Sequence, residues 1–305
     1  MAFNIGIDVG GTNVRVGVFN DITFVKEIRF KADFSQICQH NPPAIAWQQI
    51  LRFIAEAIQS VINQYPTVAA IGIGFPGFID PTSHLIAQSP NLPGLKNVDL
   101  ATDLSRLMNK KVIVENDALA AAYGEYCLMQ APAESLIYVG LGTGVGGGLI
   151  YAGKPFLGYH GVAMEIGHII IEPNGRPCGC GNLGCMEQYA SASGIKISYK
   201  LATQQDLSVH DIAALARTGD AAALQAFKLA ATHLAAALAT VLKIVDVPNI
   251  VIGGGVSHAW DLMQYTFEAK LNADLITVLR GKIKVKISSA NDQAGMLGAA
   301  MLGAT

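Results

Sequence analysis

The chain has few charged side chains and few cysteines, and both shortages narrow the classes of protein to which it can belong. Only 14% of its 305 residues are charged, its net charge is −2 and its pI is near 6.4. Neither nucleic acid nor an anionic membrane is therefore an expected partner. No uncharged apolar run approaches about 20 residues, which argues against a membrane span. The N-terminal residues lack the basic and apolar segments of a signal peptide, and we expect a cytoplasmic protein.

Hydrophobic residues make up 51% of the chain, which is ample for a large core. Single cores rarely grow beyond about 250–300 residues, so the length favours two lobes. Apolar strands alternate with segments of helical periodicity, of which residues 43–63 and 220–245 are the longest. Each half opens with a hairpin that carries a glycine-rich turn. This alternation predicts an α/β fold.

Three of the five cysteines fall within eight positions, and a histidine precedes them. His168, Cys178, Cys180 and Cys185 offer the imidazole and thiolate ligands of a tetrahedral zinc site. Four protein ligands leave no open position, so the expected zinc is structural. The alternative is a loop of free or disulfide-paired thiols. Glu165 and Glu187 flank the cluster, where a bound metal would hold both carboxylates in place.

Three glycine-rich turns follow strands. The first two are candidates for holding phosphate, because glycine lets backbone N–H groups approach a ligand closely. The third, at residues 253–255, is either a strand-to-helix turn or a surface for adenine or ribose. Residues 142–148 contain five glycines, more than a plain turn requires. None of the turns has Walker or Rossmann spacing, which disfavours a Rossmann dehydrogenase. For the first turn, a hairpin without function is the alternative. The candidates for binding a nucleotide and its Mg²⁺, with Asp8 as the metal-orienting carboxylate, are Asp8, Gly10, Gly11, Thr12, Asn13, Thr143, Gly144, Gly254 and Gly255.

The segment Glu115-Asn116-Asp117 closes a strand and precedes a helix. Asp117 could be the N-cap of that helix. A carboxylate at a strand end is equally suited to accept the proton of a sugar hydroxyl. Phosphoryl transfer needs such a base, together with donors and Mg²⁺ around the transferred group.

The motifs DVGGTN, PGFID, SPNLPG, VENDA, LGTGVGGG, EIGH, CGCGNLGCME and VIGGGVS resemble, in order and spacing, the ROK family (repressors, open reading frames and kinases). The resemblance runs from about residue 4 to residue 300. It implies two RNase H-like lobes of the actin-like ATPase superfold, with the active site in the cleft between them. Residues 1–118 with the C-terminal helix 292–305 would form the first lobe, and residues 119–291 the second, with the zinc segment at 165–187.

The resemblance further implies an ATP-dependent sugar kinase in which Asp117 is the catalytic base. The residues implied to contact the sugar are Gly77, Asn91, Asn116, Asp117, Glu165, His168 and Glu187. His168 would use one ring nitrogen for zinc and the other for the sugar. Repressor members carry an added N-terminal helix-turn-helix domain, for which the turn at Asp8 leaves no room. Family members are commonly dimers, and we expect a homodimer.

Glucose is the expected acceptor, phosphorylated at its 6-hydroxyl group. Many family glucokinases have Trp and Asn where this chain has Leu95 and Leu119. N-acetylmannosamine, N-acetylglucosamine and allose are therefore alternative substrates. A sugar-sensing protein without catalytic activity is the alternative from another class. A polyphosphate donor is disfavoured because basic residues do not cluster beside the glycine turns.

Overall fold

The computed structural model describes residues 3–10, 12–89, 92–131, 134–290 and 293–305. The chain divides into two compact units. Unit 1 comprises residues 1–134, 148–163 and 290–305, and unit 2 comprises residues 135–147 and 164–289.

The core of unit 1 is a five-stranded sheet in the order β3-β2-β1-β4-β8. The pairs β1–β2 and β2–β3 are antiparallel, whereas β4 is parallel to both β1 and β8. The strands are β1 (Phe3–Val9), β2 (Asn13–Asn20), β3 (Thr23–Lys31), β4 (Val68–Phe75) and β8 (Val112–Asn116). A small antiparallel sheet comprises β5 (Phe78–Ile79), β6 (Ile86–Gln88) and β7 (Lys96–Val98).

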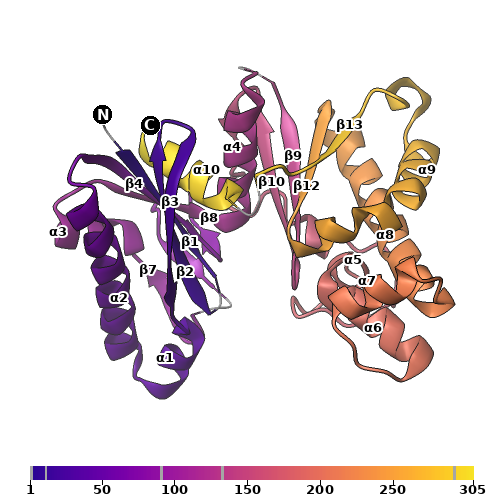
Figure 1. Ribbon diagram of the computed structural model, residues 1–305, viewed down its shortest axis with the longest axis horizontal. Coiled ribbons are helices and arrows are strands. Elements are labelled where there is room, and N and C mark those ends of the chain that lie inside the picture. The colour runs from indigo at the N-terminus through magenta and orange to yellow at the C-terminus, as the bar shows by residue number, and fades with distance from the viewer. Residues whose placement is uncertain (1–2, 11, 90–91, 132–133, 291–292) are drawn as a thin grey trace. The chain divides into compact units, whose positions relative to one another are not determined.

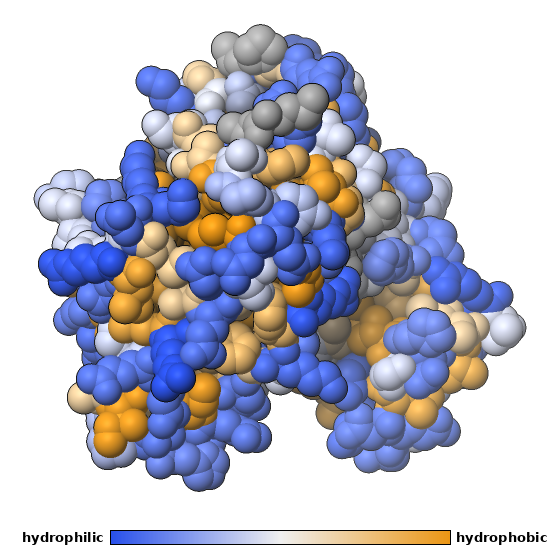
Figure 2. Space-filling model, turned by 60° about the vertical axis from the view of Figure 1, so that its left-hand side comes forward, coloured by the Kyte–Doolittle hydropathy of each residue, from blue (hydrophilic) through white to orange (hydrophobic). Residues whose placement is uncertain are grey.

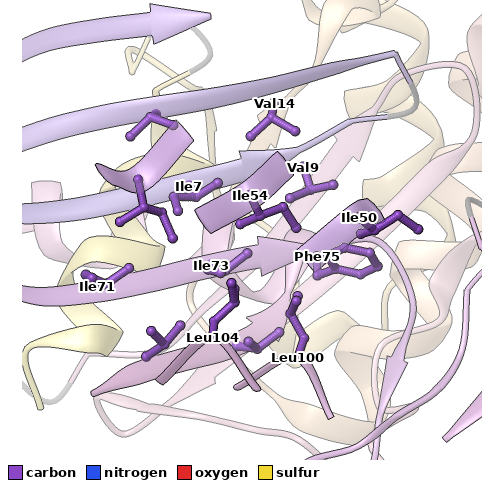
Figure 3. Packing of buried hydrophobic residues seen from close by; sticks show 14 of the residues in the cluster. Ile7, Val9, Val14, Ile50, Ile54, Ile71, Ile73, Phe75, Leu100 and Leu104 are labelled. Carbon is purple, nitrogen blue, oxygen red and sulfur yellow. The ribbon is translucent and has the colours of Figure 1, made fainter. Parts of the chain in front are cut away.

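One face of the unit 1 sheet packs against α2 and α3. Ile7 and Ile73 of the strands meet Ile54 of α2 and Leu104 of α3 in a continuous apolar cluster (Figure 3). Each such side chain contributes roughly 1.5–3 kcal/mol when fully buried. The helices of unit 1 are α1 (Phe34–His40), α2 (Pro43–Gln64), α3 (Leu100–Met108), α4 (Asp117–Met129) and the C-terminal α10 (Ala294–Gly303).

The opposite face of this sheet carries α10 and α4, so that the C-terminal helix lies beside the N-terminal strand (Figure 1). Glycines allow the close approach. A Cβ atom at Gly6 would lie 1.7 Å from the carbonyl oxygen of Met296, and one at Gly72 would lie 1.7 Å from that of Ala299. Side chains alternate along a strand, so Asp8 shares the face of Gly6.

The second five-stranded sheet has the order β11-β10-β9-β12-β13, with β12 parallel to both β9 and β13. Its pattern of a hairpin followed by parallel strands repeats that of the first sheet. The predicted α/β class with two RNase H-like halves is confirmed. The strands are β9 (Leu136–Leu141), β10 (Val145–Tyr151), β11 (Lys154–Pro155), β12 (Asn249–Gly253) and β13 (Lys284–Ile287).

The longest helix of unit 2 is α8, which packs against α5, α6, α7 and α9. By length and composition alone α8 could cross a membrane, but over half of its most apolar window is buried inside the protein. We interpret it as a core helix. The helices of unit 2 are α5 (Glu187–Ala190), α6 (Ala192–Thr203), α7 (Val209–Arg217), α8 (Ala221–Val245) and α9 (Gln264–Asp274), with short 3-10 helices at Ile166–His168, Gly255–Leu262 and Thr277–Leu279.

The expected lobe boundary after residue 118 differs from the observed one, which follows Glu134. Helix α4 stays with unit 1 because it packs tightly on α10: a Cβ atom at Gly124 would lie 2.1 Å from the carbonyl oxygen of Ala294. Residues 148–163 also belong to unit 1. There Gly161 approaches β5 so closely that a Cβ atom would lie 1.9 Å from the carbonyl oxygen of Ile79.

Hydrophilic side chains, charged and uncharged, cover much of the surface drawn in Figure 2. Figure 2 shows hydrophilic side chains over most of the face drawn, with hydrophobic side chains in several separate groups. Such scattered apolar groups are ordinary for a folded protein.

Candidate active site and metal centre

The four predicted metal ligands converge in unit 2. The ligand atoms of His168, Cys178, Cys180 and Cys185 all lie within 4.8 Å of one another. The Nδ1 atom of His168 is 3.5 Å from the Sγ atom of Cys178, and the Sγ atoms of Cys180 and Cys185 are 3.6 Å apart. A tetrahedral zinc ion with Zn–S bonds of about 2.3 Å requires S···S edges of roughly 3.8 Å. The histidine and the three cysteines therefore fit a zinc ion, and together they would supply all four ligands of a tetrahedral site.

The cysteines of the loop are reduced and lie close together. The 3.6 Å separation of Cys180 and Cys185 is far longer than a disulfide bond of about 2.05 Å, and both are free thiols. Burial raises the pKa of the Cys185 thiol to about 12. A thiolate at this position needs a nearby positive charge to compensate for its lost solvation.

The backbone of the metal loop is a distorted hairpin. Isolated antiparallel bridges join Ile170 to Cys185 and Pro177 to Leu183. The tip turns where the N–H of Gly181 donates to the carbonyl of Cys178, at 3.0 Å. These contacts within the loop bring the three cysteines close together.

His168 links the metal cluster to Glu165. The Nδ1 atom of His168 faces the cysteines, and its Nε2 atom lies 3.8 Å from the Glu165 carboxylate. The backbone explains this arrangement, because a single 3-10 turn, with the N–H of His168 donating to the carbonyl of Glu165, separates the two residues. The imidazole therefore has one nitrogen for a metal and the other on the side of a carboxylate.

Glu187 lies between the metal cluster and the glycine turn after β9. Its Oε2 atom accepts a hydrogen bond of 2.9 Å from the N–H of Val145, and its Oε1 atom lies 4.0 Å from the Sγ atom of Cys178. The turn itself is closed by the N–H of Gly142, which donates to the carbonyl of Gly144 at 3.0 Å. Thr143, at its tip, is exposed.

The two glycine turns of unit 2 are neighbours. Strands β9 and β12 are parallel and paired up to Gly140 and Gly253, so their carboxyl ends meet at one edge of the sheet. Gly254 has a positive φ of 78°, and a Cβ atom there would lie 2.5 Å from the carbonyl oxygen of Leu141. The predicted residues Thr143, Gly144, Gly254 and Gly255 therefore belong to one glycine-lined edge.

In unit 1 the first glycine turn is a tight hairpin, in which the N–H of Gly10 donates to the carbonyl of Asn13 at 2.8 Å. The amide of Asn13 donates to the hydroxyl of Thr12 at 3.1 Å. Gly11, also a predicted phosphate contact, lies outside the described residues.

Asp8 precedes this turn and faces the α10 side of the sheet, where its carboxyl group lies next to Gly295. Arg15, its cross-strand partner, approaches the Asp8 carboxylate to 3.6 Å and binds Glu27 at 2.9 Å. Arg15 is not among the site residues predicted from the sequence. Pairing the two arms of the predicted hairpin outward from the turn would have placed it opposite Asp8.

Asn116, not Asp117, caps α4. The Oδ1 atom of Asn116 accepts from the N–H of Leu119 at 3.0 Å, and its amide donates to the carbonyl of Gly77 at 3.1 Å. Gly77 packs so tightly that a Cβ atom would lie 2.7 Å from the carbonyl oxygen of Gln88. Asn116 thus ties the end of β8 to the turn after β4, and the capping role considered for Asp117 is wrong.

Asp117 is the first residue of α4 and shares a sheet face with Asp8. The register places Asp8 beside Gly74, and a Cβ atom at Gly74 would lie 3.5 Å from the Cα atom of Asp117. Lost solvation raises the pKa of Asp117, although its carboxylate accepts from the N–H of Ala118 at 2.8 Å. Its neighbour Glu115 has a pKa raised to about 7 for the same reason. A carboxyl group with a raised pKa at a strand end is suited to accept a proton near neutral pH.

The structure thus forms two groups of predicted site residues. Unit 1 contains Asp8, Gly10, Thr12, Asn13, Gly77, Asn116 and Asp117, and unit 2 contains Thr143, Gly144, Glu165, His168, Glu187, Gly254, Gly255 and the three metal-loop cysteines. Asn91 lies outside the described residues. The convergence of the two groups at one cleft stays a prediction.

Arg176 and Tyr189 were not among the predicted residues. The guanidinium of Arg176 stacks over the Tyr189 ring at 4.5 Å and binds the carbonyls of Gln188 and Gly194. The other face of Tyr189 stacks on His233 of α8, with ring centroids 4.3 Å apart. These contacts attach the metal loop to the core of unit 2. They join residues far apart in the sequence, and local spacing could not have revealed them.

Comparison with known proteins extends over almost the whole chain. The ROK family model matches residues 4–305. A glucokinase of Thermotoga maritima is 32% identical over 313 residues, covering 98% of this chain and 96% of that protein. An N-acetyl-D-glucosamine kinase of Pasteurella multocida is 29% identical, covering 97% and 98%. A crystal structure of a ROK family glucokinase from Streptomyces griseus, in complex with glucose and AMPPNP, has a TM-score of 0.79 at 29% identity and covers 99% of each chain.

Proposed function

The chain belongs to the ROK family, and from this premise we propose that it is an enzyme, an ATP-dependent kinase that transfers the γ-phosphate of ATP to a hexose. The favoured acceptor is glucose, at its 6-hydroxyl group. The proposal depends above all on the environment of Asp117. Its carboxyl group is partly buried at a strand end and has a raised pKa. Asn116 caps the following helix, so Asp117 does not have to.

In the proposed reaction Asp117 is the catalytic base. It accepts the proton of the sugar hydroxyl as the hydroxyl oxygen attacks the γ-phosphorus, and ADP leaves. Asn116 holds the strand end in position through Gly77 and the α4 backbone. Such proton transfer typically contributes 10²–10⁴-fold to a rate.

The donor nucleotide is proposed to bind the glycine turns. Thr12 and Asn13 offer side-chain donors beside Gly10 and Gly11, and Thr143 and Gly144 offer backbone N–H groups. Gly254 and Gly255 follow β12, at the start of a 3-10 helix, as contacts for phosphate or ribose. Mg²⁺ would neutralise charge on the β- and γ-phosphates, and Asp8 is the carboxylate proposed to orient it through water.

The sugar hydroxyl groups are proposed to bind Asn116, Glu165, His168 and Glu187, with Gly77 and Asn91 at the edge of the pocket. The zinc is proposed to be structural, held by His168 and the three cysteines. Its contribution would be to fix the direction of the His168 ring, whose Nε2 atom is then presented beside Glu165.

The identity of the sugar is the least constrained part of the proposal. Relatives named as glucokinase and as N-acetyl-D-glucosamine kinase have similar identity to this chain. Leu95 and Leu119 are buried, so their replacement of Trp and Asn adds apolar packing rather than a polar contact to sugar. N-acetylglucosamine, N-acetylmannosamine and allose are the alternative acceptors.

The assay that tests the function measures ADP release from Mg-ATP with glucose, mannose, allose, fructose, N-acetylglucosamine and N-acetylmannosamine in turn. Sugar-dependent release with one of them supports the kinase and names its acceptor. Release with none of them, from folded protein that contains zinc, would favour the sugar sensor. We also propose a cytoplasmic homodimer, for which light scattering would give twice the 32.1 kDa chain mass.

A further inference from the structure

Glu187 contacts the glycine turn 142–145 directly, and binding a sugar would not by itself require this contact. Its Oε2 atom accepts the N–H of Val145. The same oxygen would lie 2.5 Å from a Cβ atom placed on Gly144, so glycine is the residue that lets the carboxylate fit behind the turn. The turn and the Glu187 carboxylate therefore pack closely against each other.

A second connection reinforces the first. The N–H of Ala192 donates to the carbonyl of Gly142 at 2.9 Å, and the N–H of Ser191 donates to the carbonyl of Glu187 at 3.2 Å. The segment that follows the last metal-loop cysteine therefore holds the turn at both ends, Gly142 and Val145. Because Glu187 is only two residues beyond Cys185, a metal that fixes Cys185 also restrains Glu187.

We propose that Glu187 is a positioning residue for the nucleotide: it sets the shape of the turn 142–145, and the metal loop in turn holds Glu187, so that metal binding strengthens nucleotide binding as well as sugar binding. This inference rests on the proposed role of the turn as a phosphate site. Val145 gives its N–H to Glu187 and Gly142 gives its N–H to Gly144. The N–H groups of Thr143 and Gly144 are then the donors presented to phosphate.

The first test measures the affinity of zinc-loaded protein for Mg-ADP by calorimetry, with no sugar present. Glu187→Ala should weaken binding at least tenfold, because the Val145 N–H loses its acceptor. Glu187→Gln should restore most of the affinity, because its amide oxygen can accept the same hydrogen bond. Gln188→Ala is the matched control on the same helix, since it keeps the backbone carbonyl that Arg176 binds. Wild-type affinity in Glu187→Ala would overturn the proposal.

A double-mutant cycle tests the packing of Gly144 against Glu187 directly. Gly144→Ala should weaken Mg-ADP binding strongly when Glu187 is present, because the new methyl group displaces the carboxylate. In the Glu187→Ala background the same change should cost less than threefold. Equal losses in both backgrounds would show that Gly144 and Glu187 do not act together.

Amide exchange provides a readout that needs no variant to fold. Wild-type protein stripped of zinc should exchange the Val145 amide faster than zinc-loaded protein, with little change in the peptides of β4. Equal exchange with and without zinc would contradict the coupling. If the wild-type protein fails to bind Mg-ADP at all, the proposed function fails, whereas the exchange result still decides whether the metal loop controls the turn.

Discussion

Asn116 and Asp117, at the junction of β8 and α4, have different roles. Asn116 uses its amide to cap α4 and to hold Gly77, which leaves the carboxyl group of Asp117 available for chemistry. Helix N-termini stabilise negative charge, but loss of solvation outweighs this effect and raises the pKa of Asp117. The raised pKa makes Asp117 a stronger base than an exposed carboxylate, which suits it to accept the proton of a hydroxyl group.

Asp117→Asn should reduce kcat by about 10²–10⁴-fold, because the amide cannot accept the hydroxyl proton. Sugar affinity, measured by calorimetry, should stay within about threefold of wild type. The control is Glu56→Gln, a change of the same kind at an exposed position of α2, which should leave kcat unaltered. A near-normal kcat in Asp117→Asn would remove this residue as the base.

Glu115 gives a prediction for stability against pH. Its pKa is raised from 4.5 to about 7 by lost solvation, so the folded state binds more protons than the unfolded state between these values. The free energy of unfolding therefore falls as pH rises through this window, and the penalty is complete above about pH 7. Glu115→Gln keeps the acceptor for the Asn116 N–H and removes the charge.

Denaturant unfolding at pH 8 should find Glu115→Gln more stable than wild type by about 1–3 kcal/mol, because a pKa unit corresponds to about 1.4 kcal/mol and partial exposure reduces the full effect. At pH 4.5 the difference should largely vanish. A difference that does not change with pH would contradict the raised pKa.

At the scale of elements, the metal loop shows how the surrounding backbone decides which glycines are required. Gly184 has a φ of 78°, and a Cβ atom there would lie 1.7 Å from the carbonyl oxygen of Glu172. Gly179, between two cysteines, has nothing within 4 Å of its Cβ position. Of these two positions, Gly184 requires glycine for the hairpin to close, whereas Gly179 does not.

Gly184→Ala should therefore abolish stoichiometric zinc binding, because the hairpin strand carrying Cys185 cannot keep its contact with Glu172. Gly179→Ala is the matched control and should retain one zinc per chain. Metal content after gel filtration, measured by plasma mass spectrometry, distinguishes the two. Equal zinc content in both variants would show that the hairpin geometry does not determine the site.

Local spacing in the sequence predicts that the four candidate ligands lie close together, since all of them fall within one short segment, and the structure brings them together. The strand-end positions of Asp8 and Asp117 followed from hydrophobic runs that stop at polar residues. The contact between Glu187 and Val145 joins positions 42 residues apart. It depends on the packing of two elements and on a side-chain rotamer, neither of which a pattern along the chain encodes.

At the scale of the whole molecule, each unit is assembled from separate pieces of the chain. Unit 1 takes its last layer from the C-terminal α10, which fills the grooves over Gly6 and Gly72 and packs on Gly124. The expected boundary after residue 118 falls at the end of the VENDA motif. The observed boundary reflects contacts that α4 makes with α10, far away in the sequence.

A fragment of residues 1–134 should fail to fold, because the sheet face under α10 would expose an apolar surface that nothing covers. Joining residues 290–305 to its C-terminus through a flexible linker should restore dispersed amide signals in a proton–nitrogen NMR spectrum. A well-dispersed spectrum from residues 1–134 alone would show that α10 is dispensable for unit 1.

The proposed activity is the transfer of phosphate from ATP to a hexose. The most direct measurement is a phosphorus NMR time course of zinc-loaded protein with Mg-ATP and glucose. The γ-phosphate signal of ATP should decline while signals of ADP and glucose 6-phosphate grow at equal rates, and Asp117→Asn should suppress both. ATP that stays intact with glucose and with every alternative hexose, or that yields only inorganic phosphate, would show that the chain is not a hexose kinase.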